Sequence, residues 1–232
     1  MACAIEVSGL DKGFTLHLRG GVHLSVLDGF TLQVEVGECV ALRGPSGAGK
    51  STVLRCLYGN YLPDRGTVSV RDGEAMVDIA TAGPREILAL RRSTLGYVSQ
   101  FLRVVPRVGA LDLVMEPARE RGLDAEAARE RAVTLLERLH IPELLWDLPP
   151  ATFSGGEQQR INIARGLVGE HPILLLDEPT ASLDAANRAS VVELIKLAKA
   201  RGATVVGIFH DREVRDAVAD RVLDIDSMGA AA

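Results

Sequence analysis

The sequence predicts an α/β fold with a mainly parallel sheet core, an antiparallel β layer and an inserted helical subdomain. From residue 38 onward, short apolar segments alternate with helical segments, a pattern typical of a parallel sheet. The first 36 residues instead contain strand-like runs and a turn signal, which indicates antiparallel strands. Residues 109–148 are helical and charged, and Pro149-Pro150 closes them. We therefore expect one domain over 1–232, with a core at about 1–98 and 170–232 and a helical subdomain at about 101–168.

In the amino-terminal half, alternating apolar residues predict strands over 3–10 and in two runs within 23–36, with Asp28-Gly29 as a hairpin turn. A strand over 38–43 precedes a glycine-rich turn and a helix that ends near residue 58. Two short strands over 67–71 and 75–79 flank Asp72-Gly73. Pro84 stands at a first helical position and predicts a helix to about residue 92, and a strand follows over 95–100.

In the carboxyl-terminal half, apolar spacing within 124–140 predicts an amphipathic helix. Ser154 is expected to start the next helix, and the all-apolar run 172–176 predicts a buried parallel strand. Alternating periods then predict, in order, a helix over 186–201, a strand over 203–209, a helix over 212–219 and a strand over 222–225.

Composition excludes several classes of function. The net charge of −5 argues against a general nucleic-acid-binding surface. No apolar run approaches the ~18 residues of a membrane span, and the amino terminus does not resemble a secretory signal. The three cysteines show no C-x-x-C spacing. We expect a cytoplasmic, disulfide-free protein with no direct membrane insertion.

The strongest motif is the run Gly44-Pro45-Ser46-Gly47-Ala48-Gly49-Lys50-Ser51-Thr52, which lies between a predicted strand and a predicted helix. In this context its glycines let successive N–H groups surround phosphates, and the new helix adds its positive dipole end. Lys50 is placed to reach the terminal phosphates and the Ser51 hydroxyl to hold Mg²⁺. The alternative is a glycine-rich turn that happens to carry a lysine. The full spacing favours nucleoside triphosphate binding.

Two carboxylates follow the apolar strand that ends at Leu176. Asp177 at the strand tip is placed to hold Mg²⁺, and Glu178 to accept a proton from an attacking water. Acids that simply face solvent at the end of a strand are the alternative. The phosphate loop favours the catalytic interpretation.

The segment Ser154-Gly155-Gly156-Glu157 has a structural and a functional interpretation. Ser154 and Glu157 have the spacing of a capping box. Two glycines in a first helical turn nevertheless cost about 1 kcal/mol each relative to alanine. Such glycines suit a place where bare N–H groups approach a phosphate closely.

This segment resembles the signature motif of ABC-type ATPases, although Phe153 and Glu157 stand where leucine and glutamine are commonest. Other positions match the same family in chain order: Gln100 the glutamine loop, Ser182-Leu183-Asp184 the D-loop and His210 the switch histidine. Phe14 is the weakest match, to the aromatic residue that stacks on adenine.

The resemblance implies an ABC-type P-loop ATPase that uses ATP and Mg²⁺. It implies catalytic roles for Lys50, Glu178 and His210 and metal contacts for Ser51, Gln100 and Asp177. The implied nucleotide contacts are Phe14, Gly44, Ser46, Gly47, Gly49, Lys50, Ser51, Thr52, Gln100, Ser154, Gly155, Gly156 and Asp184. It also implies a head-to-tail dimer with a second ABC-type ATPase chain, identical or a sister subunit, in which Ser154 and Gly156 reach the ATP bound at the partner's phosphate loop.

Several segments also resemble the L subunit of the bacterial carbon–phosphorus lyase system; these are residues 20–22, 57–64, 100–107, 143–146, 153–160 and 207–211. That resemblance implies action with a soluble lyase core complex. The complex converts ATP and a phosphonate into ribose 1-methylphosphonate 5-triphosphate. The alternative is the ATP-binding subunit of a membrane ABC transporter of the exporter or lipoprotein-release type. A nucleic-acid-handling ATPase fits worse, because the chain has no length for coiled-coil insertions.

Overall fold

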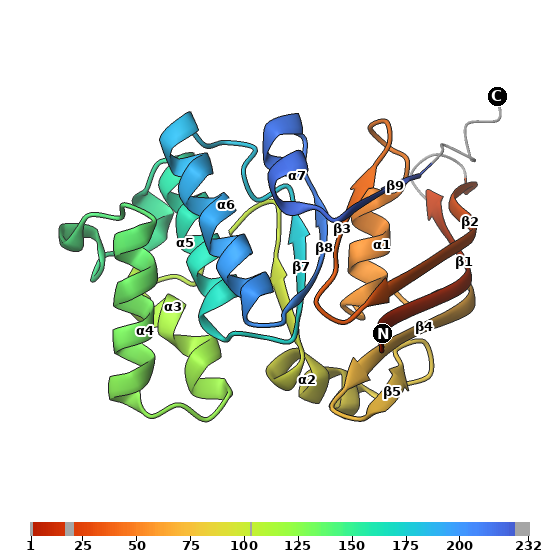
Figure 1. Ribbon diagram of the computed structural model, residues 1–232, viewed down its shortest axis with the longest axis horizontal. Helices are drawn as coiled ribbons and strands as arrows, with labels where there is room; N and C mark the ends of the chain where they lie inside the picture. Colours follow the sequence, from red (N-terminus) through yellow and green to blue (C-terminus); the bar gives the residue numbers. More distant parts are fainter. Residues whose placement is uncertain (1, 17–20, 103, 226–232) are drawn as a thin grey trace.

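The computed structural model of the chain describes residues 2–16, 21–102 and 104–225, which form two sheets and the helices that cover them (Figure 1). The parallel sheet has the strand order β6-β7-β8-β3-β9, and the antiparallel sheet has the order β2-β1-β4-β5. Both types of sheet and the alternation between strands and helices confirm the predicted α/β class.

The antiparallel sheet contains β1 (Cys3–Leu16), β2 (Val22–Glu35), β4 (Arg65–Asp72) and β5 (Ala75–Asp78). The predicted hairpin turn at Asp28-Gly29 is wrong, because β2 runs through both residues. Leu10 pairs with Phe30 and Lys12 with Leu27, so two residues of β2 stand opposite one residue of β1. Gly29 adopts a φ of 65°, a conformation open to glycine, and the pair forms a β-bulge rather than a turn.

The parallel sheet contains β3 (Cys39–Arg43), β6 (Leu95–Val98), β7 (Ile173–Asp177), β8 (Thr204–Ile208) and β9 (Arg221–Asp224). Successive side chains of its strands enter two different cores, since side chains alternate across a strand. Leu174 and Leu176 of β7 join one cluster, whereas Ile173 and Leu175 join the other. Burial on both faces explains why β7 is apolar without interruption.

Helix α1 (Lys50–Leu57) lies between the two sheets, and its residues Val53, Leu54, Cys56 and Leu57 belong to the second cluster. Helix α2 (Pro84–Ser93) precedes β6. The opposite face of the parallel sheet carries α5 (Gly155–Val168) and α6 (Ala185–Ala200), and α7 (Arg212–Val218) packs on α6 (Figure 1).

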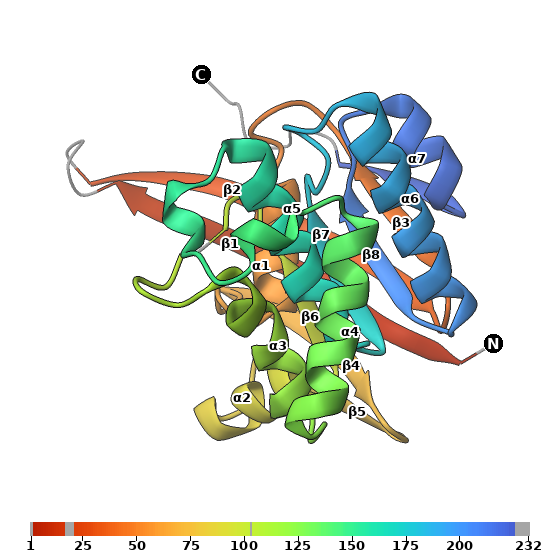
Figure 2. The same cartoon turned by 90° about the vertical axis from the view of Figure 1, so that its left-hand side faces the viewer.

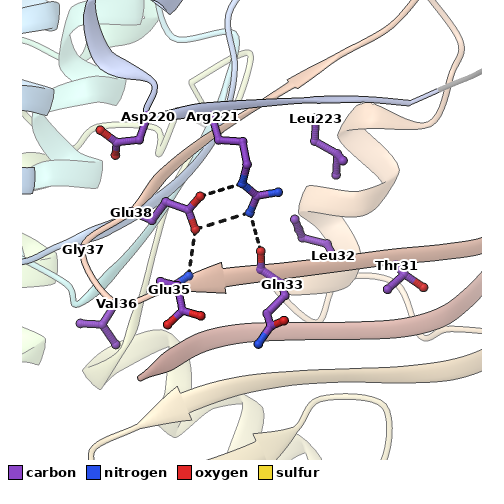
Figure 3. Close-up of a pocket in the computed structure, with 10 residues that line it drawn as sticks. All are labelled: Thr31, Leu32, Gln33, Glu35, Val36, Gly37, Glu38, Asp220, Arg221 and Leu223. Atoms are coloured by element: carbon purple, nitrogen blue, oxygen red, sulfur yellow. Dashed lines mark hydrogen bonds and ion pairs between the residues drawn. The ribbon is translucent and has the colours of Figure 1, made fainter. Parts of the chain in front are cut away.

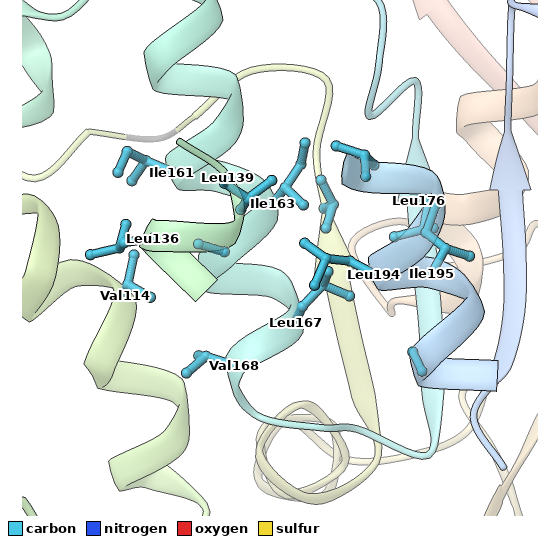
Figure 4. Close-up of a cluster of buried hydrophobic side chains, with 14 of the residues drawn as sticks. Val114, Leu136, Leu139, Ile161, Ile163, Leu167, Val168, Leu176, Leu194 and Ile195 are labelled. Atoms are coloured by element: carbon cyan, nitrogen blue, oxygen red, sulfur yellow. The ribbon is translucent and has the colours of Figure 1, made fainter. Parts of the chain in front are cut away.

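In the region of the predicted helical subdomain, the chain forms α3 (Ala110–Glu120), α4 (Ala125–Arg138) and α5, which pack on one another (Figure 2). Two 3₁₀ turns, Glu143–Leu145 and Pro150–Thr152, connect α4 to α5. Val114, Leu136, Ile161 and Leu167 from these helices meet Leu194 of α6 in one continuous cluster (Figure 4). The boundaries of this subdomain stay a prediction. Among the helices in the described part of the chain, none is long and apolar enough to span a bilayer.

Candidate functional site: a phosphate loop and its facing carboxylates

The phosphate loop joins β3 to α1, as its spacing predicts. Gly47 and Gly49 have φ angles of 84° and 91°, where only glycine is free of strain. A Cβ at Gly49 would lie 2.7 Å from Leu27 Cδ2 of β2, so the antiparallel layer supports the loop directly. Lys50 Nζ donates to the main-chain carbonyls of Gly44 and Pro45, each at 2.8 Å. The ammonium group therefore lies across the loop, whereas Ser46 and Gly47 are exposed.

Ser51, in the first turn of α1, faces the carboxyl end of β7. Its Oγ donates to Asp177 Oδ1 at 2.9 Å, and the Tyr97 hydroxyl donates to Oδ2 at 3.2 Å. Burial raises the pKa of Asp177 above its usual value, and the hydrogen bonds from Ser51 and Tyr97 and the charge of Arg55 act in the opposite direction. A buried carboxylate is thus fixed beside a hydroxyl at the mouth of the phosphate loop.

Glu178 follows directly and is held by two of the predicted site residues. His210 Nε2 lies 3.0 Å from Oε1, and Gln100 Nε2 donates to Oε2 at 3.2 Å. The backbone of Glu178 has a φ of 53° and its N–H donates to the carbonyl of Ile208 at 3.1 Å. This turn carries the Glu178 side chain away from the strand axis and between two polar side chains from neighbouring loops.

The serine–glycine tip, residues 154–156, lies at the start of α5, on the other side of the parallel sheet from α1 (Figure 1). The predicted capping box is present: Glu157 Oε2 accepts from Ser154 N at 2.8 Å and from Ser154 Oγ at 2.7 Å. Ser154 and Gly155 are exposed, and a Cβ at Gly155 would meet nothing within 4 Å. Bare N–H groups are therefore presented at the surface of the domain.

Asp184 lies close to the serine–glycine tip. It caps α6 by accepting from Asn187 N at 2.8 Å, and that backbone hydrogen bond lowers its pKa. A Cβ at Gly156 would lie 3.5 Å from the carbonyl of Ser182, so the two motifs are neighbours. Arg160 links them further, since it donates to the carbonyl of Gly156 at 3.3 Å and to Asn187 Oδ1 at 3.0 Å.

Phe14 is the predicted site residue with the least connection to the rest. It lies in β1, where its ring packs edge-to-face on Tyr61 at 5.2 Å and Lys12 Nζ lies 5.5 Å from its centre. Its contact with adenine stays a prediction. A cavity of about 640 Å³ between β2 and β9 contains none of the predicted site residues; Arg221 crosses it to reach Glu38 (Figure 3).

The residues present suit Mg²⁺. A hydroxyl and a carboxylate lie 2.9 Å apart at Ser51 and Asp177. Over residues 2–16, 21–102 and 104–225, no three His, Cys, Asp or Glu side chains gather into a cage of their own. Mg²⁺ is typically bound through one or two protein ligands together with substrate phosphates, which is the set that this site can offer.

Sequence reasoning missed three residues that organise these motifs: Arg55, Tyr97 and Arg160. Arg55 follows Ser51 by four residues, a spacing that places both on one face of α1, and could have been noticed. In the sequence, Tyr97 is recognisable only as part of a strand, because a half-buried aromatic residue is usually a packing residue.

The glycine-rich loop, its lysine and the carboxylates at the adjacent strand tip define a P-loop nucleotide-binding protein. A family model described as ABC transporter matches residues 27–181, more than half of the chain. The chain belongs to this family, and it is an ABC-type P-loop ATPase.

Relatives and solved structures agree with this assignment. The chain is 40% identical over 211 residues to the macrolide export ATP-binding/permease protein MacB of Brucella abortus, covering 91% of the chain but 32% of that protein. It thus spans about a third of that relative's length. It is 36% identical to a probable amino-acid ABC transporter ATP-binding protein of Haemophilus influenzae, covering 94% of the chain and 82% of that protein.

The fold matches the ATP-binding cassette MJ0796, solved as a dimer bound to ADP and phosphate, with a TM-score of 0.87 and 29% identity over 96% of this chain and 94% of that one. The ABC-type fold is therefore confirmed. These relatives are transporter proteins, and they give no support to the lyase subfamily.

Proposed function

We propose that two ABC-type ATPase chains of this architecture close head to tail around ATP and Mg²⁺, and that each site needs residues of both. The observation that carries this proposal is the separation of its two phosphate-binding features. The phosphate loop and Lys50 lie at the start of α1, whereas the exposed serine–glycine tip lies at the start of α5, on the other side of the parallel sheet. The similar cassette MJ0796 was solved as a dimer, which supports the pairing of two such chains.

Each side chain has a distinct part in hydrolysis. Lys50 and the loop N–H groups bind the β- and γ-phosphates, and Ser51 and Asp177 hold Mg²⁺, which neutralises phosphate charge when bound. Glu178 accepts the proton of the attacking water, while His210 and Gln100 hold its carboxylate in place. Ser154 and the glycines beside it donate to the γ-phosphate from the facing chain. Loss of that phosphate removes the link between the chains, and the dimer reopens.

The movement that follows serves a partner. The relatives favour a transporter, and we infer that the chain is the ATP-binding part that drives a membrane permease. The similarity to MacB supports export as the direction of transport, because that relative is named as a macrolide export protein.

The carbon–phosphorus lyase system is the second candidate, and specific segments favour it. The resemblance rests mainly on residues 57–64, 100–107, 153–160 and 207–211. Gly20 and Arg103 of the quoted segments lie outside the described residues. Within the described part of 100–107, Phe101 is 74% exposed and Val105 is 41% exposed. Exposed apolar side chains near Gln100 suit contact with a protein partner, whether a permease or a lyase core.

One experiment separates the candidates. The full chain carrying a tag and Glu178→Gln is expressed in its own cells and recovered both from detergent-free cytosol and from membranes in mild detergent. Co-purification with permease chains from membranes supports the transporter. Recovery of a soluble phosphonate-processing complex from cytosol supports the lyase system instead. In a separate measurement on the native chain, ATP turnover at the full rate by a strictly monomeric preparation would refute the dimer for both.

A further inference from the structure

Asp177 is held from two sides by hydroxyl groups. Ser51 bonds Oδ1 at 2.9 Å, and Tyr97 bonds Oδ2 at 3.2 Å. Among the described residues, these two are the hydrogen-bond partners of the Asp177 carboxylate. The plane of the carboxylate is therefore set by two donors, of which one, Ser51, belongs to the expected metal site and the other, Tyr97, does not.

Tyr97 is itself fixed in place. Its ring stacks on Tyr58, with centroids 4.9 Å apart and planes at 23°, and Arg91 covers the Tyr58 ring at 4.5 Å. Arg55 and Tyr61 line the same cavity as Tyr97, and Arg55 Nη1 donates to the Tyr61 hydroxyl at 2.9 Å.

Asp177 is thus contacted from two elements. Ser51 of α1 donates to Oδ1, and Tyr97 of β6 donates to Oδ2. Residues behind a metal ligand orient it in this way in many metal sites.

We propose that Tyr97 is a positioning residue that orients Asp177 for Mg²⁺. This inference rests on the proposed nucleotide–magnesium site. It concerns a residue of β6 that the ATPase motifs do not include.

The first test removes one hydroxyl group. Tyr97→Phe keeps the ring stacked on Tyr58 and deletes only the bond to Asp177. Mn²⁺ is titrated into the ADP complex of the full chain, and free Mn²⁺ is measured by electron paramagnetic resonance. We expect about tenfold weaker Mn²⁺ binding, the lower end of the usual effect of such outer residues. ADP affinity without metal is expected to stay within about twofold of the native value, which a general structural defect would not allow.

Tyr61→Phe is the matched control, because it deletes a hydroxyl that lines the same cavity of about 600 Å³ without touching Asp177. It is expected to leave Mn²⁺ affinity within about twofold of native, the usual error of additive behaviour. An equal loss in both tyrosine variants would overturn the specific role of Tyr97.

If the native chain binds no Mn²⁺ with ADP, the proposed site fails; if it does and Tyr97→Phe binds equally well, only the present inference fails.

Discussion

Replacement of Glu178 by glutamine tests the catalytic centre most directly. The variant keeps the shape of the side chain, and its amide can still bond one partner as acceptor and the other as donor. His210 and Gln100 therefore keep a neighbour at 3.0 and 3.2 Å, and stability is expected to change by no more than about 1 kcal/mol. The amide cannot accept a proton from water, so the general base is lost.

The expected effect is a fall in turnover of ~10²–10⁴, which is about 2.7–5.5 kcal/mol in activation free energy. Phosphate release is measured at saturating ATP and Mg²⁺, and ATP affinity by fluorescence of a labelled analogue. Glu170→Gln is a matched control, since Glu170 also has a positive φ, 47°, and pairs with Arg131 at 2.9 Å instead of with site residues. Native turnover by Glu178→Gln would show that another group is the base.

Three further outcomes are expected. Lys50→Ala removes the ammonium that spans Gly44 and Pro45 and should weaken ATP binding by ~10–100-fold in the same fluorescence assay, the value of a charge-assisted bond; unchanged affinity would contradict the role of the lysine. Ser154→Ala should lower the free energy of unfolding by about 1 kcal/mol through loss of the cap, and should reduce turnover at least ~10²-fold while each chain still binds ATP; native turnover in the variant would refute a role at the facing site. Burial lowers the pKa of His171 to about 4, so the unfolded chain binds a proton between pH 6.5 and 4 that the folded chain does not. The contribution of neutral His171 to the free energy of unfolding is complete above pH 6.5, and it should fall by up to about 1.4 kcal/mol per pH unit as the pH decreases towards 4. Chemical denaturation at several pH values should therefore show a flatter dependence of unfolding free energy on pH for His171→Gln. An equal slope in the variant would exclude His171 as the cause.

Much of the fold is predictable from the sequence because local patterns and the final packing agree. The run ending at Asp177 is apolar throughout since its side chains enter cores on both faces, and Ser154 starts a helix because its capping box satisfies backbone groups at that end. The bulge at Gly29 could not be separated from a hairpin turn, because Asp-Gly suits both and only the partner strand decides between them.

The candidate site divides in the same way. The loop glycines, Lys50 and the pair Asp177–Glu178 have fixed spacing along the chain, so short patterns reveal them. Tyr97 matters through a contact with Asp177 across 80 residues of chain, which no local pattern encodes. For Phe14 the difficulty is the reverse. Its place in the sequence suggests a contact with adenine, whereas the neighbours seen in the structure are Tyr61 and Lys12.

The contacts of Arg160 have a mechanical consequence. Its guanidinium reaches the carbonyls of Leu139 and His140 and the side chain of Asn187, while its Nε reaches the carbonyl of Gly156. One side chain thereby links the start of α5, the end of α4 and the start of α6. Because these three helix ends share one guanidinium, a displacement of one of them is expected to shift the other two with it.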